Sequence, residues 1–350
     1  MSINSILNIA TSGLFASQSG IKTVSQNIAN VNTKGYVRVE QQQEALNLAN
    51  KNAGVQVSSL RRAANRFLQA ASINATGDSG NQAAKSQYLS DLQSFFGDPT
   101  SASSLFSKVN SSLAVFETAV SNPGSVSVRR DIISNMQSLL SQLGQTSVQI
   151  QNLRTQADSE IGSTISQINK LLADVAAING EITRGTIQGD ATGAQERQSQ
   201  IIDELSQLID IRVDFSDDGV GKIYTSDGLF LAGFEASQLN YTPSSSGQTF
   251  YDTIGITYGT DPLQRTMETA IQSGKLRGLL DVRNHDLPDM AEYLGEFAAK
   301  FADAVNAVHN VAASLPALAN AQGVDTGLLS GDALGFTGQT ALGIVATDGS

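Results

Sequence analysis

Cysteine and tryptophan are absent from this 350-residue sequence, and only 6% of its residues are aromatic. Without cysteine the chain cannot form disulfides, and it has no thiolate to act as a nucleophile or as a metal ligand. Large aromatic side chains supply much of the area buried in compact cores. A chain that is 40% hydrophobic but poor in aromatics suits long helices packed side by side. We therefore expect a mainly α fold, an elongated rod-like helical bundle with long coiled-coil-type helices and a smaller portion rich in β-hairpins.

Basic charge is also scarce, because 22 Lys and Arg residues face 33 Asp and Glu residues and the net charge is -11. A protein that binds nucleic acid needs a basic face that displaces counterions from phosphate. The largest basic clusters here are pairs such as Arg61-Arg62 and Arg129-Arg130. Neither nucleic acid nor an anionic membrane surface is therefore an expected partner.

Long apolar runs are missing as well. No run approaches the roughly 20 residues that a helix needs to cross a bilayer. The first basic residue is Lys22, so the sequence lacks the positively charged start of a cleaved secretory signal. We expect the protein either to stay inside the cell or to leave it by a route that does not cleave it.

The clearest positive feature is an apolar stripe in the first 31 residues. Its steps alternate between three and four residues, a repeat of about 3.5 residues that is typical of a coiled-coil seam. Gly35 and the polar residues before it predict the end of this helix. No segment nearby is long enough to cover the seam, so we expect its partner to lie far along the chain or on another copy. We assign to this assembly seam Leu7, Leu14, Ile21, Val24, Ile28 and Val31, with Ala10 and Ser17 between them.

A second heptad stripe runs from Ile132 to Ile182. A helix of that length spans about 75 Å, which indicates a rod rather than a compact domain. Two successive steps of four residues around Ala157 form a stutter, which would locally unwind a left-handed supercoil. Glycine is a weak helix former, so we expect bends or breaks at Gly144 and Gly162.

The remaining periodicity predicts shorter elements. Alternating apolar residues separated by Asp-Gly turns predict β-hairpins at about residues 211–260, and two short strands are expected around residues 36–39 and 55–57. The other predicted elements are helices through residues 67–73 and 88–95, a helix capped by Ser103 or Ser104 and ended by Asn122-Pro123-Gly124, a Gly/Thr-rich loop at 183–194, a helix at 195–209 and a last helix after Pro288.

No group of residues points to catalysis. Gly219-Val220-Gly221-Lys222 resembles part of a phosphate loop, but Ser216 replaces the loop's first glycine and Ile223 replaces its metal-binding Ser or Thr. We interpret this stretch as a hairpin turn. The two histidines, His285 and His309, have no partners at the spacing of a zinc site. We therefore predict no enzyme activity and no catalytic, cofactor-binding or metal-binding residues.

Two stretches near the N-terminus occur together. Ser12-Gly13-Leu14 is followed by Asn-Ile-Ala-Asn-Val-Asn-Thr-Lys-Gly-Tyr at residues 27–36. This combination resembles the N-terminal motif shared by the axial proteins of the bacterial flagellum, which are the rod, hook and hook-associated proteins. The family motif residues are Asn27, Asn30, Asn32, Thr33, Gly35 and Tyr36.

Further segments narrow the resemblance to the hook-associated family that joins the hook to the filament. The likeness extends over about residues 1–312, although Asn65 stands where that family usually shows Asp. The segments are Gly54–Val57 with Arg66-Phe67-Leu68, Ile201–Ser206 with Val213, Gly274–Leu276 with Leu279–Asp281, and Phe301 with Val305–Asn310.

The resemblance implies a structural subunit of the hook–filament junction that assembles helically through its heptad helices. It implies as partners other copies of the chain, the hook protein, the second hook–filament junction protein and a flagellar export chaperone. It implies no cofactor. The implied location is extracellular, in the flagellum, after type III export without a cleaved signal peptide.

The resemblance also implies four regions in the chain. Residues 1–36 would form the assembly and export helix, 37–62 a short β-containing connector, 63–312 a rod-like helical core with the hairpin insert, and 313–350 the start of an inserted outer domain. The family ends with a second heptad helix, which does not occur before Ser350. We interpret the chain as lacking its C-terminal part, where the chaperone would bind. We expect residues 1–36 to be disordered in the isolated chain.

Two alternatives remain open. One is another axial flagellar protein, a hook or rod subunit. The other is an axial protein fused to a peptidoglycan-cleaving domain, which would need paired carboxylates that the sequence does not group together.

Overall fold

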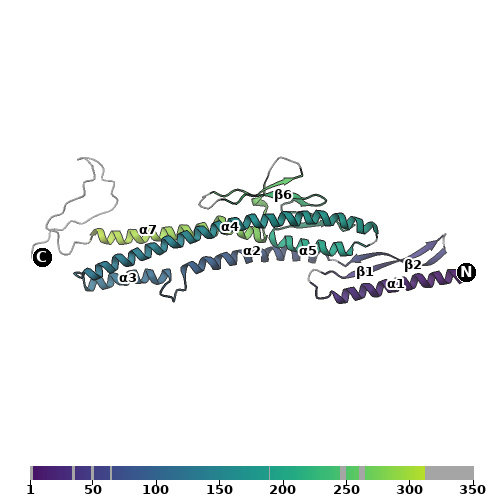
Figure 1. The fold of residues 1–350 in the computed structure, drawn as a ribbon, viewed down its shortest axis with the longest axis horizontal. Coiled ribbons are helices and arrows are strands. Elements are labelled where there is room, and N and C mark those ends of the chain that lie inside the picture. Colours follow the sequence, from purple (N-terminus) through teal and green to yellow (C-terminus); the bar gives the residue numbers. More distant parts are fainter. Residues whose placement is uncertain are drawn as a thin grey trace, which may run out of the picture. The chain divides into compact units, whose positions relative to one another are not determined.

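The computed structural model describes residues 3–33, 36–48, 51–63, 65–188, 190–244, 250–259 and 265–311. Long helices dominate and short antiparallel strands form the smaller part (Figure 1), which confirms the predicted mainly α class. The predicted outer domain at 313–350 lies outside the described residues. In chain order the elements are α1 (Ile3–Ala29), β1 (Val39–Leu48), β2 (Lys51–Arg62), α2 (Arg66–Phe96), α3 (Leu105–Ser121), α4 (Val126–Gln188), α5 (Thr192–Leu208), β3 (Arg212–Phe215), β4 (Gly221–Tyr224), β5 (Phe230–Ala232), β6 (Ser237–Asn240), β7 (Gly255–Tyr258), β8 (Arg265–Thr266), α6 (Gly274–Asp281) and α7 (Leu287–Val311).

The chain divides into two compact units. The first consists of Met1–Tyr88 and Thr155–Arg283, and the second of Leu89–Arg154 and Asn284–Ser350. Helices α2 and α4 contribute residues to both units. The four regions suggested by the sequence remain a prediction.

The heptad stripe of α4 is buried over most of its length. Every member of the stripe from Leu139 to Ile182 is at most 6% exposed, including Ala157 in the stutter. The helix runs unbroken for 63 residues, so the expected breaks at Gly144 and Gly162 are wrong. Gly162 serves a different purpose, because a Cβ there would lie 2.5 Å from Cγ of Pro243. The missing side chain makes room for the loop after β6.

Helix α2 is one helix of 31 residues, where the sequence predicted two. Gly77 and Gly80 lie inside this helix and face other backbone segments. A Cβ at Gly80 would lie 2.2 Å from the carbonyl oxygen of Gln207, and one at Gly77 would lie 3.3 Å from that of Ser206. These glycines let α2 approach the C-terminal end of α5, and that packing outweighs their poor helix propensity.

The predicted loop at 183–194 is mostly helical. Helix α4 continues to Gln188 and α5 begins at Thr192. In α4 the hydroxyl of Thr186 donates to the carbonyl of Ile182 at 2.9 Å, so this residue supports the helix. The sharp return of the chain depends on Gly185, where a Cβ would lie 2.8 Å from the carbonyl oxygen of Asp190.

Helix α3 follows its prediction. Ser104 caps it and accepts a hydrogen bond from the amide of Ser107 at 3.1 Å. Within the second unit, α3 contacts α4 through the hydroxyl of Ser112, which donates to the carbonyl of Asn135 at 3.5 Å. Asn122 ends the helix.

The last helix begins earlier than predicted. Helix α6 starts at Gly274, a π-helical turn follows at Val282–Asp286, and α7 continues from Leu287. Proline has no N–H to donate and its ring crowds the carbonyl four residues back. The wider π turn lies directly before Pro288, so the chain passes the proline without leaving the helical path. His285 therefore lies inside this turn and not ahead of the helix.

The strands form the predicted hairpins, but the strand predicted at residues 36–39 is wrong for residues 36–38, which precede β1. Strands β1 and β2 pair from Val39–Arg62 to Leu48–Lys51, so the polar stretch between the two predicted strands is itself β. Strands β3, β4 and β5 form one sheet, and β6, β7 and β8 form another. Gly219 and Gly228 occupy the Asp-Gly turns with φ of 86° and 88°.

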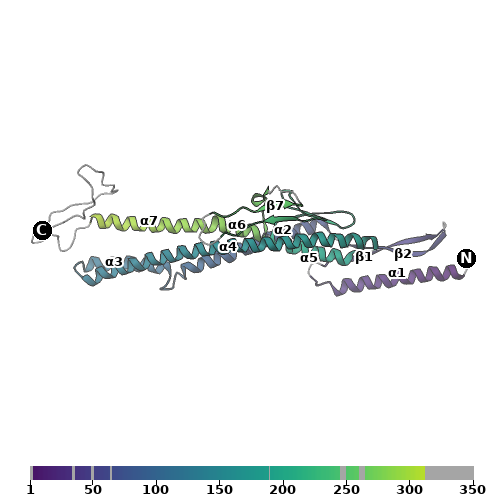
Figure 2. The same cartoon turned by 45° about the horizontal axis from the view of Figure 1, so that its top comes forward.

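The strands lie beside α4 (Figure 2), and two asparagines of α4 hold these sheets against the helix. Asn169 donates to the carbonyl of Leu239 and accepts from its amide, both at 2.8 Å. Asn179, which is fully buried, forms the same pair with Gly221 at 2.8 and 3.1 Å and also donates to Gly233 at 2.7 Å. Each side-chain amide therefore bonds the strand backbone as a neighbouring strand would.

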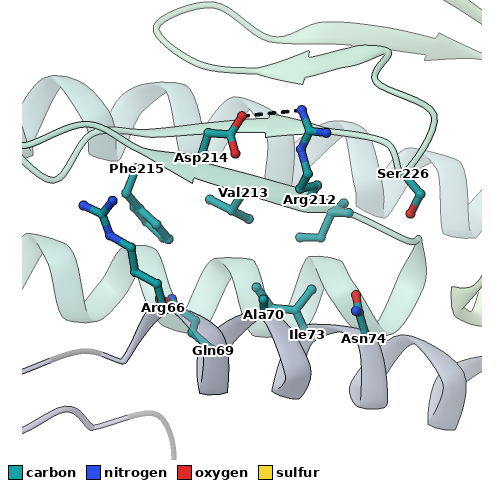
Figure 3. A pocket seen from close by; sticks show the side chains of 11 residues that line it. Arg66, Gln69, Ala70, Ile73, Asn74, Arg212, Val213, Asp214, Phe215 and Ser226 are labelled. Atoms are coloured by element: carbon teal, nitrogen blue, oxygen red, sulfur yellow. Dashed lines mark hydrogen bonds and ion pairs between the residues drawn. The ribbon is translucent and has the colours of Figure 1, made fainter.

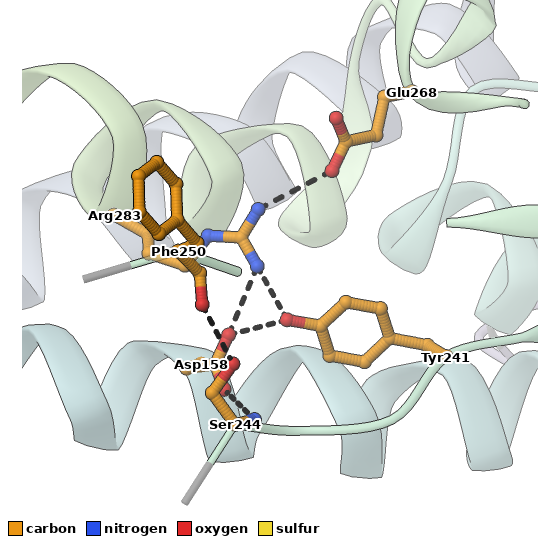
Figure 4. A network of polar contacts seen from close by, with 6 residues as sticks. All are labelled: Asp158, Tyr241, Ser244, Phe250, Glu268 and Arg283. Atoms are coloured by element: carbon orange, nitrogen blue, oxygen red, sulfur yellow. Dashed lines mark hydrogen bonds and ion pairs between the residues drawn. The ribbon is translucent and has the colours of Figure 1, made fainter. Parts of the chain in front are cut away.

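A buried arginine joins α4 to the segments around β6–β8 (Figure 4). Arg283, in the π turn, is 1% exposed and donates to Asp158 of α4 at 2.9 Å and to Glu268 at 3.2 Å. It also donates to the hydroxyl of Tyr241, which donates in turn to Asp158. The amide of Ser244 donates to the other oxygen of Asp158 at 2.7 Å. Burial and the bond to Asp158 raise the pKa of Tyr241, so its hydroxyl stays a neutral donor.

The close approach of α2 predicts opposite effects for two Gly→Ala substitutions. Gly80→Ala is expected to destabilise the protein by about 1–3 kcal/mol, because the new methyl group overlaps the backbone of Gln207. Gly144→Ala has open space within 4 Å and is expected to stabilise it by about 0.5–1 kcal/mol. Urea unfolding of both variants measures the difference. Equal effects of the two substitutions would contradict this packing.

The buried ion pair predicts a large cost for removing one partner. Arg283→Met leaves the carboxylate of Asp158 buried and is expected to reduce the free energy of unfolding by about 3–5 kcal/mol. The control is Arg212→Met, which removes an ion pair to Asp214 whose side chains are both 58% exposed. That change is expected to cost less than about 1 kcal/mol. Similar losses in the two variants would show that the network does not hold the sheets.

Candidate functional site

The predicted assembly seam lies on the open side of α1. Residues 3–29 are helical in the structure and lie along the β1–β2 hairpin (Figure 1), so the expected disorder of this segment is not what the structure shows. Among the described residues nothing covers the seam. Its members are between 56% and 74% exposed: Leu7, Leu14, Ile21, Val24, Ile28 and Val31.

A different face of α1 is held by the hairpin. Ala16 and Thr23 are the buried residues of this helix. The amide of Val55 donates to the hydroxyl of Ser12 at 3.2 Å, and the side-chain amide of Gln41 donates to the carbonyl of Ala16 at 3.1 Å. The hairpin therefore fixes the orientation of α1 without using its large apolar side chains.

The motif residue Asn27 ties the end of α1 to the start of β1. Its amide nitrogen donates to the carbonyl of Val39 at 2.8 Å, and its oxygen accepts from the amide of Val39 at 2.9 Å. The hydroxyl of Tyr36 donates to the same oxygen at 2.8 Å. Asn27 and Tyr36 were predicted as family motif residues, and the structure brings them together.

The other motif residues shape the turn after α1. Asn30 donates from its side chain to the carbonyl of Gln26 at 3.0 Å and accepts from the hydroxyl of Thr33 at 3.3 Å. Asn32 is exposed in the same turn. Gly35 lies outside the described residues. The motif thus stops the helix and turns the chain back into the hairpin.

A groove of about 1000 Å³ runs between α1 and β1. The seam residues Val24, Ile28 and Val31 form part of its lining, and Tyr36 and Arg38 form another part. The seam is therefore continuous with an open hollow beside it.

Metal-ligand clusters are absent from the part of the chain that the structure describes. Within it, no group of three or more His, Cys, Asp or Glu residues could hold a metal ion. The stretch Gly219–Lys222 forms the turn between β3 and β4 and the first residues of β4. None of the helices among the described residues is long and apolar enough to span a membrane.

Some residues of the first unit were not singled out from the sequence. Arg62, at the end of β2, donates to the carbonyl of Gln195 and to the hydroxyl of Ser199, both at 2.9 Å, and so ties the hairpin to α5. A basic pair at this position was visible in the sequence, but its contact lies more than 130 residues away. Only the fold places these residues together.

Comparison with known proteins gives a consistent result. A sequence model described as the helical domain of flagellar hook-associated protein FlgK matches residues 89–322, and one for flagella basal body rod proteins matches residues 7–36. Flagellar hook-associated protein 1 of Salmonella typhimurium is 30% identical over 321 residues, which cover 88% of this chain and 57% of that protein. Flagellar hook-associated protein 1 of Bacillus subtilis is 24% identical over 339 residues, which cover 87% of this chain and 66% of that protein.

A solved structure shares the fold. The flagellar hook junction protein FlgK from Burkholderia pseudomallei superimposes with a TM-score of 0.58 over 72% of this chain and 45% of that chain, at 23% identity. The chain spans about 57% of the length of the Salmonella relative.

The contacts of Asn27 predict that it holds the hairpin on α1. Asn27→Ala removes three hydrogen bonds and is expected to weaken the attachment by about 1–3 kcal/mol. Hydrogen exchange at the amides of β1 and β2 should then become faster. The control is Asn30→Ala, whose bonds stay within the end of α1 and its turn. Unchanged exchange in the strands of the Asn27 variant would contradict this role.

Proposed function

Because this chain belongs to the flagellar hook-associated protein 1 (FlgK) family, we propose that it is a structural subunit of the junction between hook and filament. Its function is mechanical, and it assembles with other copies through the seam of α1. The observation that carries the proposal is the exposure of five heptad-spaced apolar side chains on a helix whose position the hairpin already fixes, with the sixth seam residue, Val31, in the turn that follows the helix. The match to the family's helical domain over residues 89–322 supports it.

The seam offers enough apolar surface to stabilise an assembly. Each buried Leu, Ile or Val side chain contributes on the order of 1.5–3 kcal/mol. The apolar stripe of a heptad helix is buried when another such helix packs against it with its side chains between those of the first. An exposed row of this kind therefore favours association with a second heptad helix, from this protein or from a neighbouring copy.

Helix α4 is suited to the layer outside the seam helices. Its stripe from Leu139 to Ile182 is buried within the chain, so this helix needs no partner copy to be stable. We propose that the helical domain, matched over residues 89–322, carries mechanical load between subunits, and that α1 forms the contact that holds the subunits together. The heptad repeat would thus join subunits in α1 and stabilise the chain's own helical domain in α4.

The proposed partners are other copies, the hook protein, the second junction protein and a flagellar export chaperone. The relatives' names refer to the flagellar hook and support a place in the flagellum. We propose export without a cleaved signal and an extracellular location in the junction. The absence of cysteine fits such a route, because no disulfide would keep the chain from being exported unfolded.

A hook or rod subunit is the second candidate within the same family of axial proteins. The rod-protein model matches only residues 7–36, the segment that the axial proteins share. The helical-domain model covers residues 89–322 and favours the junction. The reading frame in the genome distinguishes the two, since an inserted domain followed by a C-terminal heptad helix would favour the junction protein.

The seam predicts a defect of assembly without a defect of export. Leu14→Asp with Ile21→Asp places two charges in the seam, so the protein should be exported and then lost from the hook tip into the medium. The matched control, Asn8→Asp with Gln26→Asp, places the same charges on exposed positions away from the seam and should be retained. Immunoblots of medium and purified hooks measure both. Normal filaments on cells that carry only the seam variant would refute the proposal.

A further inference from the structure

A second surface without a known role lies where α2 begins. The first turns of α2 and the edge strand β3 enclose a groove of about 480 Å³ (Figure 3). Its floor is apolar, with Ala70 and Ile73 from α2 and Val213 and Phe215 from β3. Strand β3 is the edge of its sheet, so no further strand lies beyond it among the described residues.

Arginines surround one end of this groove. Arg66 lines it and also lines an adjoining hollow of about 590 Å³. Arg61 and Arg62 line that hollow as well, and Asp217 is the acidic residue in its wall. The opposite rim is neutral, because Arg212 pairs with Asp214 at 3.5 Å. The groove therefore has an apolar floor and an excess of positive charge at one end.

One of these arginines has an unused donor. Nη1 of Arg62 donates to α5, whereas Nη2 is buried and has no hydrogen-bond partner. Burial lowers the pKa of Arg62, while nearby Glu196 acts in the opposite direction. A buried N–H of a charged group that lacks an acceptor is costly. A carboxylate matches a guanidinium in geometry and charge, and the arginines here that are exposed to an incoming carboxylate are Arg61 and Arg66.

Two large apolar residues stand beside the arginines. Phe67 is 89% exposed and Leu68 is 69% exposed. Their backbone is held at the start of α2, because the side chain of Asn65 accepts hydrogen bonds from both amides, at 3.0 and 3.3 Å. An exposed Phe-Leu pair next to a cationic hollow is typical of an interaction surface and not of a solvated helix end.

We propose that this surface, formed by Arg61, Arg62, Arg66, Phe67 and the β3 groove, docks a carboxylate-bearing segment of a second copy of the chain. The charge distribution identifies the partner. Residues 1–88 contain eight Lys and Arg against three Asp and Glu, whereas the rest of the chain contains fourteen against thirty. One copy thus offers the acidic surface that the N-terminal region of another attracts.

Such a contact joins two different surfaces, so it is heterologous and propagates into a helical array where its rotation does not close a ring. The inference rests on the proposed function and adds to it an interface separate from the seam. Because the new contact depends on charge and the seam contact on apolar burial, salt should weaken the former much more than the latter.

The test uses the chain with the seam already disabled by Leu14→Asp and Ile21→Asp. Sedimentation velocity at low and high salt should show salt-sensitive self-association in this background. Adding Arg61→Glu with Arg66→Glu should weaken it roughly tenfold, as expected for reversal of charges at an interface. The control, Arg129→Glu with Arg130→Glu, makes the same change of net charge at exposed sites of α4 and should leave association unaltered.

A photoreactive phenylalanine analogue in place of Phe67 identifies the occupant. In a mixture of nitrogen-15-labelled and unlabelled chains, the crosslinked product should join a labelled to an unlabelled peptide, and the second peptide should contain Asp or Glu. A chain that stays monomeric up to about 1 mM, the weak end of protein association, would overturn the proposal. The proposal would also be overturned if the crosslinks formed only within one chain. The same holds if the Arg61/Arg66 and Arg129/Arg130 substitutions weakened self-association equally. The seam and the proposed function would stand in each case, since retention at the hook tests them separately.

Discussion

An apolar stripe that repeats every seven residues requires a surface that covers it, and the rest of this structure depends on how that requirement is met in two helices. In α4 the stripe is covered within the chain, and every member from Leu139 to Ile182 is buried. In α1 the stripe is left open while another face of the helix packs on the β1–β2 hairpin. The same pattern thus stabilises a domain in one helix and, on our proposal, joins subunits in the other.

Small and polar residues attach the strands, loops and helix ends to the long helices α1, α2 and α4. Gly80 and Gly162 remove side chains where a loop or helix end approaches the helix backbone. Asn27, Asn169 and Asn179 each bond both the amide and the carbonyl of one strand residue. Because an asparagine side chain has the same donor and acceptor as a peptide group, it can extend a sheet from the surface of a helix. Strands are thereby docked with few large aromatic side chains, which this sequence has in small number.

Periodicity made much of the fold predictable. The α4 stripe, the Ser104 cap and the Asp-Gly hairpins depend on residues close together in the sequence, and the structure has them. The predicted break at Gly162 was wrong because this glycine makes room for Pro243, which lies far along the chain, and Gly144 is simply accommodated in the helix. The groove at the start of α2 was not predictable for the same reason, since it needs β3 beside Arg66. The apolar stripe of α1 was visible in the sequence because its repeat lies within a short stretch, and the structure shows that its side chains are exposed.

The central claim is that the α1 seam is open in the isolated chain and covered in the flagellum. Since the sequence contains no cysteine, Ile21→Cys introduces a single reactive thiol in the seam, and Gln26→Cys introduces one at an exposed position away from it. The measurement is the rate of maleimide labelling of each variant, in the isolated chain and in purified hook–filament complexes. The account predicts fast labelling of both variants in isolation and protection of the position-21 thiol alone after assembly. Equal labelling at position 21 before and after assembly would contradict it.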